Sequence, residues 1–227
     1  MHTVKRMRFN MEIIWRSLYF YFRFPVSLRQ VAELLNDRGV KVSHMSILRW
    51  AVKFGPDLEE KFRKYKQPVN LSWRIDETYI KIRGEDRYLY RAVDKNGNTV
   101  DFLLTARRDL IAAKRFLKKA IRNHGAPLKT NIDKSGSNLA ALSCVNQSRG
   151  NRQFQIRQVK YLNNIVEQDH RFIKKRIRPM LGFKNFNSAK IIIAGIEIMN
   201  MIFKNQSGYM PLLHQDPIDA YWALVRS

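Results

Sequence analysis

The chain has 227 residues, and its 42 Lys and Arg against 19 Asp and Glu give a formal net charge of +23. This excess of positive charge indicates a polyanionic partner, either nucleic acid or an anionic membrane. A hydrophobic content of 45% is enough for a packed core and excludes a disordered basic tail. The single cysteine excludes a disulfide framework or a cysteine-based zinc site and indicates a reducing compartment such as the cytoplasm.

The first third of the chain is predicted to be helical. Residues 1–24 mix basic and aromatic side chains with apolar residues at helical spacing, which favours a core-facing helix over a surface that stacks bases. Ser27 and Gln30 can form a capping box for a second helix, and a turn at Gly39 leads to Ser43 as the N-cap of a third. Helix, glycine-containing turn and helix is a helix-turn-helix pattern, although an ordinary helical hairpin has the same appearance.

The last helix of this pattern has an inward and an outward face. Its candidates for the core are Met45, Ile47, Leu48, Trp50 and Ala51. Its outward side chains, which are the predicted DNA contacts, are His44, Ser46, Arg49 and Lys53. Residues 1–55 are therefore expected to form a helical DNA-binding region, and residues 56–72 a linker with a short charged helix.

From residue 73 the apolar residues alternate with polar ones, which is typical of strands. Strands are expected at 73–82, 88–93, 99–105, 128–133 and 154–159. Helices are expected at about 109–123, 137–142, 161–177 and 187–204. The fourth strand follows a helix and is therefore expected to run parallel to the first. This order predicts a mixed α/β, ribonuclease-H-like domain over residues 73–206, with residues 207–227 as a C-terminal tail.

Three carboxylates stand in contexts that suit metal binding. Asp76 lies within the first expected strand, Asp133 ends the fourth, and Glu167 opens a basic helix. If the two strands are neighbours, the two Asp side chains can share a metal. Oxygen ligands favour Mg²⁺ or Mn²⁺, and two ions about 4 Å apart support in-line displacement at phosphorus. Spacing alone does not single out these three acids, and Glu167 could simply form a surface ion pair.

The neighbouring residues strengthen the assignment. Glu77 should point to the opposite sheet face from Asp76, Asp94 suits a turn, and Asp109 suits a helix cap. Cations surround Glu167 on its own helix and beyond it. They are His170, if protonated, Arg171, Lys174, Lys175, Arg176 and Arg178. This pattern predicts a surface that binds DNA phosphates in a salt-sensitive way, with a merely solubilising surface as the alternative.

Several blocks of the chain resemble the D-D-E transposases of the insertion-sequence-six family, in the family's order. They are Trp73-Arg-Ile-Asp-Glu-Thr-Tyr-Ile-Lys-Ile, Tyr88-Leu-Tyr-Arg-Ala-Val-Asp94, Ala112-Ala-Lys-Arg-Phe-Leu117, Asn163-Asn-Ile-Val-Glu167 and Arg178-Pro-Met-Leu-Gly-Phe-Lys184. The resemblance runs from the helix-turn-helix to about Gln206. It implies a catalytic triad of Asp76, Asp133 and Glu167, with Lys174 as the family's basic residue seven positions after the Glu.

The resemblance also implies an activity. Such an enzyme performs Mg²⁺-dependent cleavage at an element's terminal repeats and strand transfer to target DNA, usually giving cointegrates. The chain departs from the family at Asp86, where a Trp is expected, in the segment after Asp133, which lacks the usual aromatic residue, and in the tail after Asp216.

The leading hypothesis is thus an active transposase. Asp76 would bridge two Mg²⁺ ions, with Mn²⁺ as a substitute, and Asp133 and Glu167 would each hold one. The partners would be the terminal inverted repeats and target DNA, bound by a homodimer or larger assembly at the nucleoid in the bacterial cytoplasm. A catalytically inactive, element-derived DNA-binding protein or repressor is the alternative. A membrane protein is disfavoured because no apolar run reaches about 18 residues and no long helix has one basic and one apolar face.

Overall fold

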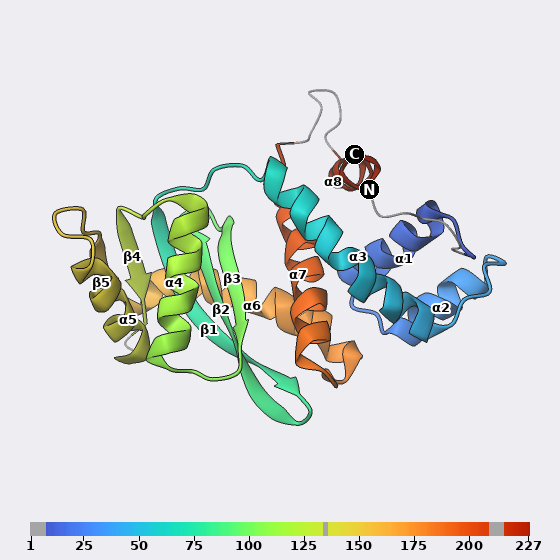
Figure 1. Ribbon diagram of the computed structural model, residues 1–227, viewed down its shortest axis with the longest axis horizontal. Coiled ribbons are helices and arrows are strands. Elements are labelled where there is room, and N and C mark those ends of the chain that lie inside the picture. Colours follow the sequence, from blue (N-terminus) through green and yellow to red (C-terminus); the bar gives the residue numbers. More distant parts are fainter. Residues whose placement is uncertain (1–7, 134–135, 209–215) are drawn as a thin grey trace. The chain divides into compact units, whose positions relative to one another are not determined.

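The structure is a computed structural model that describes residues 8–133, 136–208 and 216–227. Lys134 and Ser135, in the segment where the chain departs from the family, lie outside the described residues. The chain forms two compact units (Figure 1). The first combines the N-terminal residues up to Lys66 with residues 175–181 and 186–227. The second combines Gln67–Lys174 with Gly182–Asn185.

The first unit is helical. Its helices are α1 (Met11–Arg23), α2 (Leu28–Asn36), α3 (His44–Tyr65), the 3-10 turn η2 (Arg178–Met180), α7 (Phe186–Phe203) and α8 (Pro217–Arg226). Ser27 and Gln30 form the expected capping box, and Ser43 caps α3 by accepting a hydrogen bond from the Ser46 backbone N–H at 3.2 Å. The helices of the helix-turn-helix pattern therefore begin where the sequence predicts them.

The helix α3 is longer than expected. A linker with a separate short helix was predicted after residue 55, but α3 runs on through Pro56 to Tyr65, and only residues 66–71 precede the first strand. Proline in a helix costs a backbone hydrogen bond. Buried Phe54, Leu58 and Phe62 continue the apolar stripe of Ile47 past that proline. Packing of this stripe stabilises the helix where local propensity would end it.

The helix α7 contacts α1, α3 and α8. Glycines sit at two of these contacts, since a Cβ at Gly55 would lie 2.5 Å from Ile191 Cγ2 and one at Gly195 would lie 2.7 Å from the Phe22 ring. By length and composition alone, Phe186–Phe203 could cross a membrane, but 67% of it is buried inside the protein. This extent of burial is typical of a helix in a protein core.

Replacing Gly195 with Ala should destabilise the protein. The added methyl group would overlap the ring of Phe22, which is fully buried. We expect a loss of about 1–3 kcal/mol in the free energy of unfolding, although Ala is the better helix former. Urea unfolding would measure it. Phe22→Leu in the same chain should restore part of the loss, and an unchanged midpoint for Gly195→Ala would refute this account of the crossing.

The C-terminal segment was described as a tail, but the structure forms α8 there. Asp216 caps it by accepting from the Ile218 backbone N–H at 2.9 Å, and Pro217 occupies its first turn. Tyr221 is fully buried, and its hydroxyl donates to the Trp15 carbonyl at 2.7 Å. An N-cap Asp followed by Pro is a helix-start signal that the sequence already contained.

The second unit is a five-stranded mixed sheet with helices on both faces. Its elements are β1 (Ser72–Ile82), β2 (Glu85–Asp94), β3 (Thr99–Thr105), α4 (Leu110–His124), β4 (Lys129–Ile132), α5 (Gly136–Gln147), β5 (Gln155–Gln158), η1 (Lys160–Asn163) and α6 (Asn164–Ile177), whose last turn belongs to the first unit. The strand order is β3-β2-β1-β4-β5. The first three strands are antiparallel, and β4 and β5 run parallel to β1. This is the predicted ribonuclease-H-like topology.

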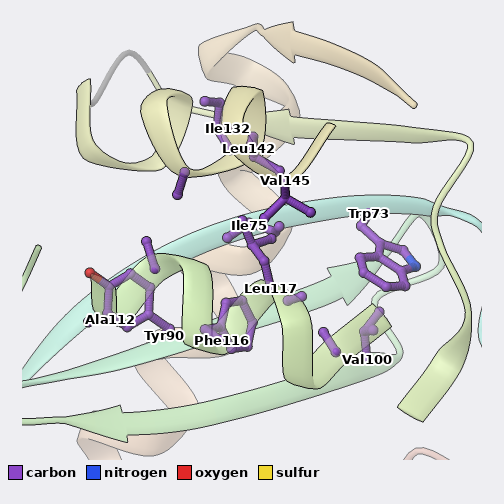
Figure 2. Close-up of a cluster of buried hydrophobic side chains, with 14 of the residues drawn as sticks. Trp73, Ile75, Tyr90, Val100, Ala112, Phe116, Leu117, Ile132, Leu142 and Val145 are labelled. Atoms are coloured by element: carbon purple, nitrogen blue, oxygen red, sulfur yellow. The ribbon is translucent and has the colours of Figure 1, made fainter. Parts of the chain in front are cut away.

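One face of this sheet carries the apolar core. Trp73 and Ile75 of β1 and Tyr90 of β2 pack there against Phe116 of α4 and Leu142 of α5, among others (Figure 2). Because side chains alternate across a strand, Asp76 must point to the opposite face, where α6 lies.

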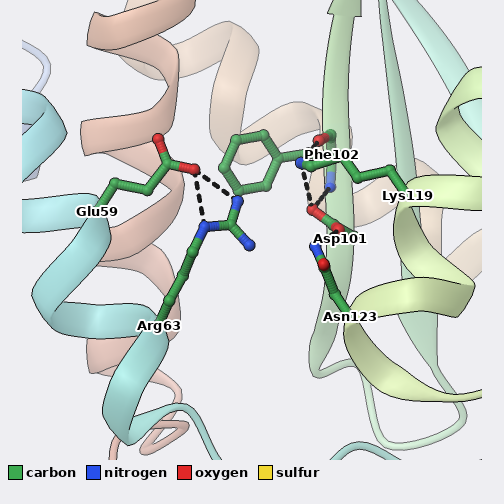
Figure 3. A network of polar contacts seen from close by, with 6 residues as sticks. All are labelled: Glu59, Arg63, Asp101, Phe102, Lys119 and Asn123. Carbon is green, nitrogen blue, oxygen red and sulfur yellow. Dashed lines mark hydrogen bonds and ion pairs between the residues drawn. The ribbon is translucent and has the colours of Figure 1, made fainter.

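A buried polar network fixes α4 to the edge strand β3. Asp101 is 2% exposed and accepts hydrogen bonds from Lys119 Nζ at 2.7 Å, Asn123 Nδ2 at 2.9 Å and the Phe102 backbone N–H at 2.8 Å (Figure 3). Asp109 also caps α4 as predicted, accepting from Ala112 N at 2.8 Å. The loop between β3 and α4 is thereby held between two anchored elements.

Candidate active site

The register of the sheet brings the first two predicted carboxylates to adjacent positions. The β1 and β4 strands pair in parallel, with Ser72 opposite Lys129 and Arg74 opposite Asn131. This pairing joins residues 57 positions apart, and Asp133 follows Asp76 by the same 57 positions. Continuing the register by two residues beyond its last paired position therefore leads to Asp76 and Asp133, on the same face of the two strands.

The carboxyl group of Asp76 is in an unfavourable place for a charge. Its side chain is 17% exposed, and its pKa is raised from 3.8 to about 7. Burial is the largest cause, and the charges of Glu77, Asp133 and Glu167 act in the same direction, while a backbone hydrogen bond lowers this pKa. Both other members of the predicted triad are thus close enough to act on Asp76 electrostatically.

The α6 helix contacts β1 through His170. Together with Asn163 of the preceding η1 turn, the side chains of Val166, His170 and Ile173 form a buried stripe, and Glu167 flanks it as an exposed residue. His170 Nδ1 lies 3.4 Å from Asp76 Oδ2. Burial, followed by the charge of Arg91, lowers the pKa of His170 to about 3, so its imidazole is neutral and this contact is not an ion pair at neutral pH.

A second contact holds α6 against β2. Arg91 is fully buried, pairs with Asp76 in the β1–β2 register, and its Nη2 lies 2.7 Å from Asp169 Oδ2. Sequence reasoning did not single out either residue of this ion pair. An arginine inside an otherwise apolar strand was the available signal, because a buried charge needs a partner.

The residue types of this site suit a divalent cation. The three candidate ligands supply only carboxylate oxygens, the donors that Mg²⁺ prefers. The charges of Asp133 and Glu167 repel the partly desolvated carboxylate of Asp76, and a bound cation would offset this repulsion. Among the residues the structure describes, no three His, Cys, Asp or Glu side chains are gathered closely enough to hold a metal. The three carboxylates therefore match such an ion in donor type and in charge, and not in the spacing of their side chains.

Glu77 faces away from this site, as predicted. Asn138 Nδ2 of α5 donates to its Oε2 at 2.6 Å, and Arg108 from the β3–α4 loop forms an ion pair with it. Glu77 therefore belongs to the α4–α5 side of the sheet.

Four of the five lysines and arginines predicted to follow Glu167 as DNA contacts have exposed side chains. Arg171, Lys174, Lys175 and Arg178 are exposed, and Lys174 Nζ lies 4.7 Å from the centre of the Tyr79 ring. Arg176 is the exception, because it is only 6% exposed, and burial lowers its pKa to about 10. Its prediction as a DNA contact is wrong. Arg176 follows the buried Ile173 by three positions on α6, so both side chains lie on the buried face of the helix.

The helix-turn-helix residues are divided in the same way. Arg49 and Lys53 of α3 are exposed, whereas His44 and Ser46 are half-buried. Ser46 Oγ also lies 3.0 Å from Ser43 Oγ at the helix start. Met45, expected in the core, is 44% exposed and adds an apolar side chain to this surface.

Comparison with known proteins places the chain in a family. A model of the DDE domain of IS240 transposases matches residues 70–206. The transposase of the IS431mec insertion-sequence-like element of Staphylococcus aureus is 36% identical over 209 residues, 90% of each chain. The Staphylococcus aureus transposase of IS257 in transposon Tn4003 has the same identity and coverage. The chain belongs to the DDE transposases of the insertion-sequence-six family. It is accordingly an enzyme that cleaves DNA and transfers strands.

Solved structures with a similar chain path include the HTLV-2 integrase catalytic core domain in complex with magnesium. It is 16% identical, covers 68% of this transposase and 97% of its own chain, and has a TM-score of 0.46. The catalytic core domain of BIV integrase has the same score at 15% identity, covering 69% of this chain and 97% of its own.

One departure from the family has a structural explanation. Asp86, where a Trp is expected, lies at the tip of the β1–β2 hairpin, is 44% exposed and pairs with Lys81 at 2.9 Å. The ion pair occupies an exposed site at which a large apolar side chain would face solvent.

Proposed function

We propose that Asp76, Asp133 and Glu167 are the catalytic triad of this transposase and that they hold two Mg²⁺ ions, for which Mn²⁺ substitutes. The observation that carries the proposal is the Asp76 carboxyl group, which is only 17% exposed in the middle of β1 and is repelled by the charges of Glu77, Asp133 and Glu167. A carboxylate costs free energy in such a place, and a bound divalent cation offsets that cost.

The chemistry needs no nucleophilic side chain. When bound, the two ions supply positive charge to the attacking and leaving oxygens of an in-line displacement. In cleavage, a water oxygen bonds to phosphorus and the bond to the 3′ oxygen breaks, which leaves a 3′-hydroxyl and a 5′-phosphate. In strand transfer, that hydroxyl attacks a target phosphodiester. Asp76 would serve both ions, and Asp133 and Glu167 one each.

The cations around the site would place the DNA. Arg171, Lys174, Lys175 and Arg178 are exposed on and just after α6 and would bind backbone phosphates. The outward residues of α3 would contact the terminal inverted repeats. They are His44, Ser46, Arg49 and Lys53. Joining two element ends to a target requires a homodimer or larger assembly, acting at the nucleoid in the bacterial cytoplasm and usually giving cointegrates.

Glu167→Gln tests the proposal in an assay with a supercoiled donor plasmid, a target plasmid and Mg²⁺. Removing a ligand charge should lower transposition by at least about a thousandfold, since several kcal/mol of transition-state stabilisation are lost. Binding of the terminal repeats should be unchanged. The matched control is Glu85→Gln, which removes an exposed acid from the β1–β2 hairpin and should transpose normally.

Two results would contradict the proposal in different ways. Equal transposition by Glu167→Gln and the wild type would remove Glu167 from the triad. A wild-type protein that binds the terminal repeats but neither binds Mn²⁺ nor cleaves would identify the chain as an inactive, DNA-binding relative of these enzymes.

A further inference from the structure

Two buried asparagines connect the strands of the site to the start of α6. Asn131 of β4 is 4% exposed, and Asn163, the last residue of η1, is 1% exposed. Asn131 Nδ2 donates to Asn163 Oδ1 at 2.6 Å and to the Val159 carbonyl at 2.9 Å. Its Oδ1 accepts from the Val159 backbone N–H at 3.3 Å. The amide of Asn131 thus joins the end of β5 to the turn that precedes α6.

The same pair touches each strand that carries a candidate ligand. Asn163 Nδ2 donates to the Ile75 carbonyl at 3.4 Å, and Ile75 directly precedes Asp76 in β1. Asn131 lies two residues before Asp133, the residue that directly follows β4. Asn163 also lies four residues, about one helical turn, before Glu167. The asparagine pair therefore lies within four residues of Asp133 and Glu167 in the chain, and it is hydrogen-bonded to the residue before Asp76.

Neutral amides at these positions are not explained by packing alone. Burying an amide is unfavourable unless its hydrogen bonds are made, and apolar residues would fill the space without that cost. These hydrogen bonds provide orientation, because each of them sets the distance and direction of the turn relative to β1 and β4. Glu167 itself is exposed on the flank of the helix, where packing does little to fix it.

Resting on the proposed function, we propose that Asn131 and Asn163 are positioning residues that set where Glu167 meets Asp76 and Asp133. The later turns of α6 have their own attachments, Asp169 to Arg91 and His170 to Asp76. The asparagine pair governs the first turn, which carries Glu167. Loosening this turn weakens the metal site while the rest of α6 remains docked.

Mn²⁺ titration of the full-length protein, with the metal alone as the probe, tests this inference. Removing an outer residue that orients a metal ligand typically costs 10–100-fold in metal affinity, and we expect a loss in that range for Asn163→Ala. Amide hydrogen exchange should accelerate at residues 164–168 and stay slow at residues 170–173. In a Glu167→Gln background, Asn163→Ala should cause little further loss, because the residue that it positions is already gone.

A matched control exists in the same unit. Asn146 of α5 is a buried asparagine whose amide donates to the Phe154 carbonyl at 2.7 Å and accepts from its N–H at 2.8 Å. Asn146→Ala should lower stability comparably but leave Mn²⁺ affinity unchanged. If Asn163→Ala does not fold, Asn131→Ser carries the same expectation, since it cuts the pair from the β4 side and keeps the bond to Ile75.

The outcomes separate the inference from the proposed function. Wild-type Mn²⁺ affinity in a folded Asn163→Ala or Asn131→Ser protein overturns the inference, provided that Glu167→Gln weakens binding. An equal loss in Asn146→Ala also overturns it, because general destabilisation then suffices. Unchanged affinity in Glu167→Gln contradicts the proposed triad instead. Weaker binding confined to the Asn131–Asn163 pair supports the inference.

Discussion

Replacing Asp76 with Asn is expected to abolish transposition while making the metal-free protein more stable. The loss of activity, at least about a thousandfold, follows from removing the ligand proposed to serve both ions. The gain in stability follows from its environment, because the wild-type carboxylate is desolvated and repelled by the charges of Glu77, Asp133 and Glu167. Its neutral isostere has the same shape without the repelled charge.

The gain in stability should depend on pH. The pKa of Asp76 rises from 3.8 to about 7 on folding, so the folded state holds this proton more tightly than the unfolded state. Wild-type stability therefore falls as pH rises from about 4 to 7, and the full cost is present above 7. With roughly 1.4 kcal/mol for each pKa unit, this cost is on the order of 4 kcal/mol at most. The amide recovers part of it, roughly 1–3 kcal/mol at pH 8 and little at pH 4.

Chemical unfolding in EDTA at a series of pH values would measure this difference. Asp86→Asn is the control, since Asp86 is exposed and pairs with Lys81, and it should shift stability by less than about 1 kcal/mol. Adding Mg²⁺ should stabilise the wild type and not Asp76→Asn, because only the former binds the ion. Destabilisation by Asp76→Asn at pH 8 in EDTA would contradict the account of this site.

Replacing Asp169 with Ala is expected to give the largest loss of stability among the ion-pair variants of this chain. It removes the carboxylate that lies 2.7 Å from the fully buried guanidinium of Arg91, whose charge stays inside the protein. Breaking a buried pair from one side typically costs about 3–5 kcal/mol. Because this pair holds α6 on β2, the Mg²⁺ concentration for half-maximal activity should rise as well.

Thermal and urea unfolding would measure this loss. The comparison is Glu59→Ala, which removes the partly exposed partner of Arg63 on α3, 3.0 Å from its Nε, and should cost less than about 1 kcal/mol (Figure 3). The double variant Arg91→Met/Asp169→Leu should regain most of the stability, since apolar residues replace both charges. A loss no greater than that of Glu59→Ala would mean that the Arg91 charge is compensated elsewhere.

Much of the fold could be predicted from local patterns. Period-two alternation located the strands, and Asp94 and Asp109 marked a turn and a cap that the structure contains. The errors arose where packing overrides local signals. The sequence predicts a linker from residue 56, where Pro56 stands, but the buried stripe that includes Phe54 and Leu58 continues α3 past this proline. Local patterns predict only a tail at α8, because Tyr221 bonds to Trp15, about two hundred residues away in the sequence.

At the candidate site, too, local patterns predicted some features and tertiary packing decided others. The residue types and their contexts were enough to select Asp76, Asp133 and Glu167 and to exclude Glu77, because strand alternation is a local property. Burial is not local, so Arg176 was wrongly assigned to the DNA surface although its neighbour Lys175 is exposed.

The sequence by itself determined the class of fold, the acids that carry the proposed chemistry and the family to which the chain belongs, since each depends on the order and type of nearby residues. Only the tertiary structure decided how those acids are held. The 57-residue offset between β1 and β4, the buried Arg91–Asp169 ion pair and the Asn131–Asn163 pair all join segments far apart in the chain. Contacts of this kind exist only after the sheet has formed and α6 has docked, and they leave no periodic pattern in the sequence.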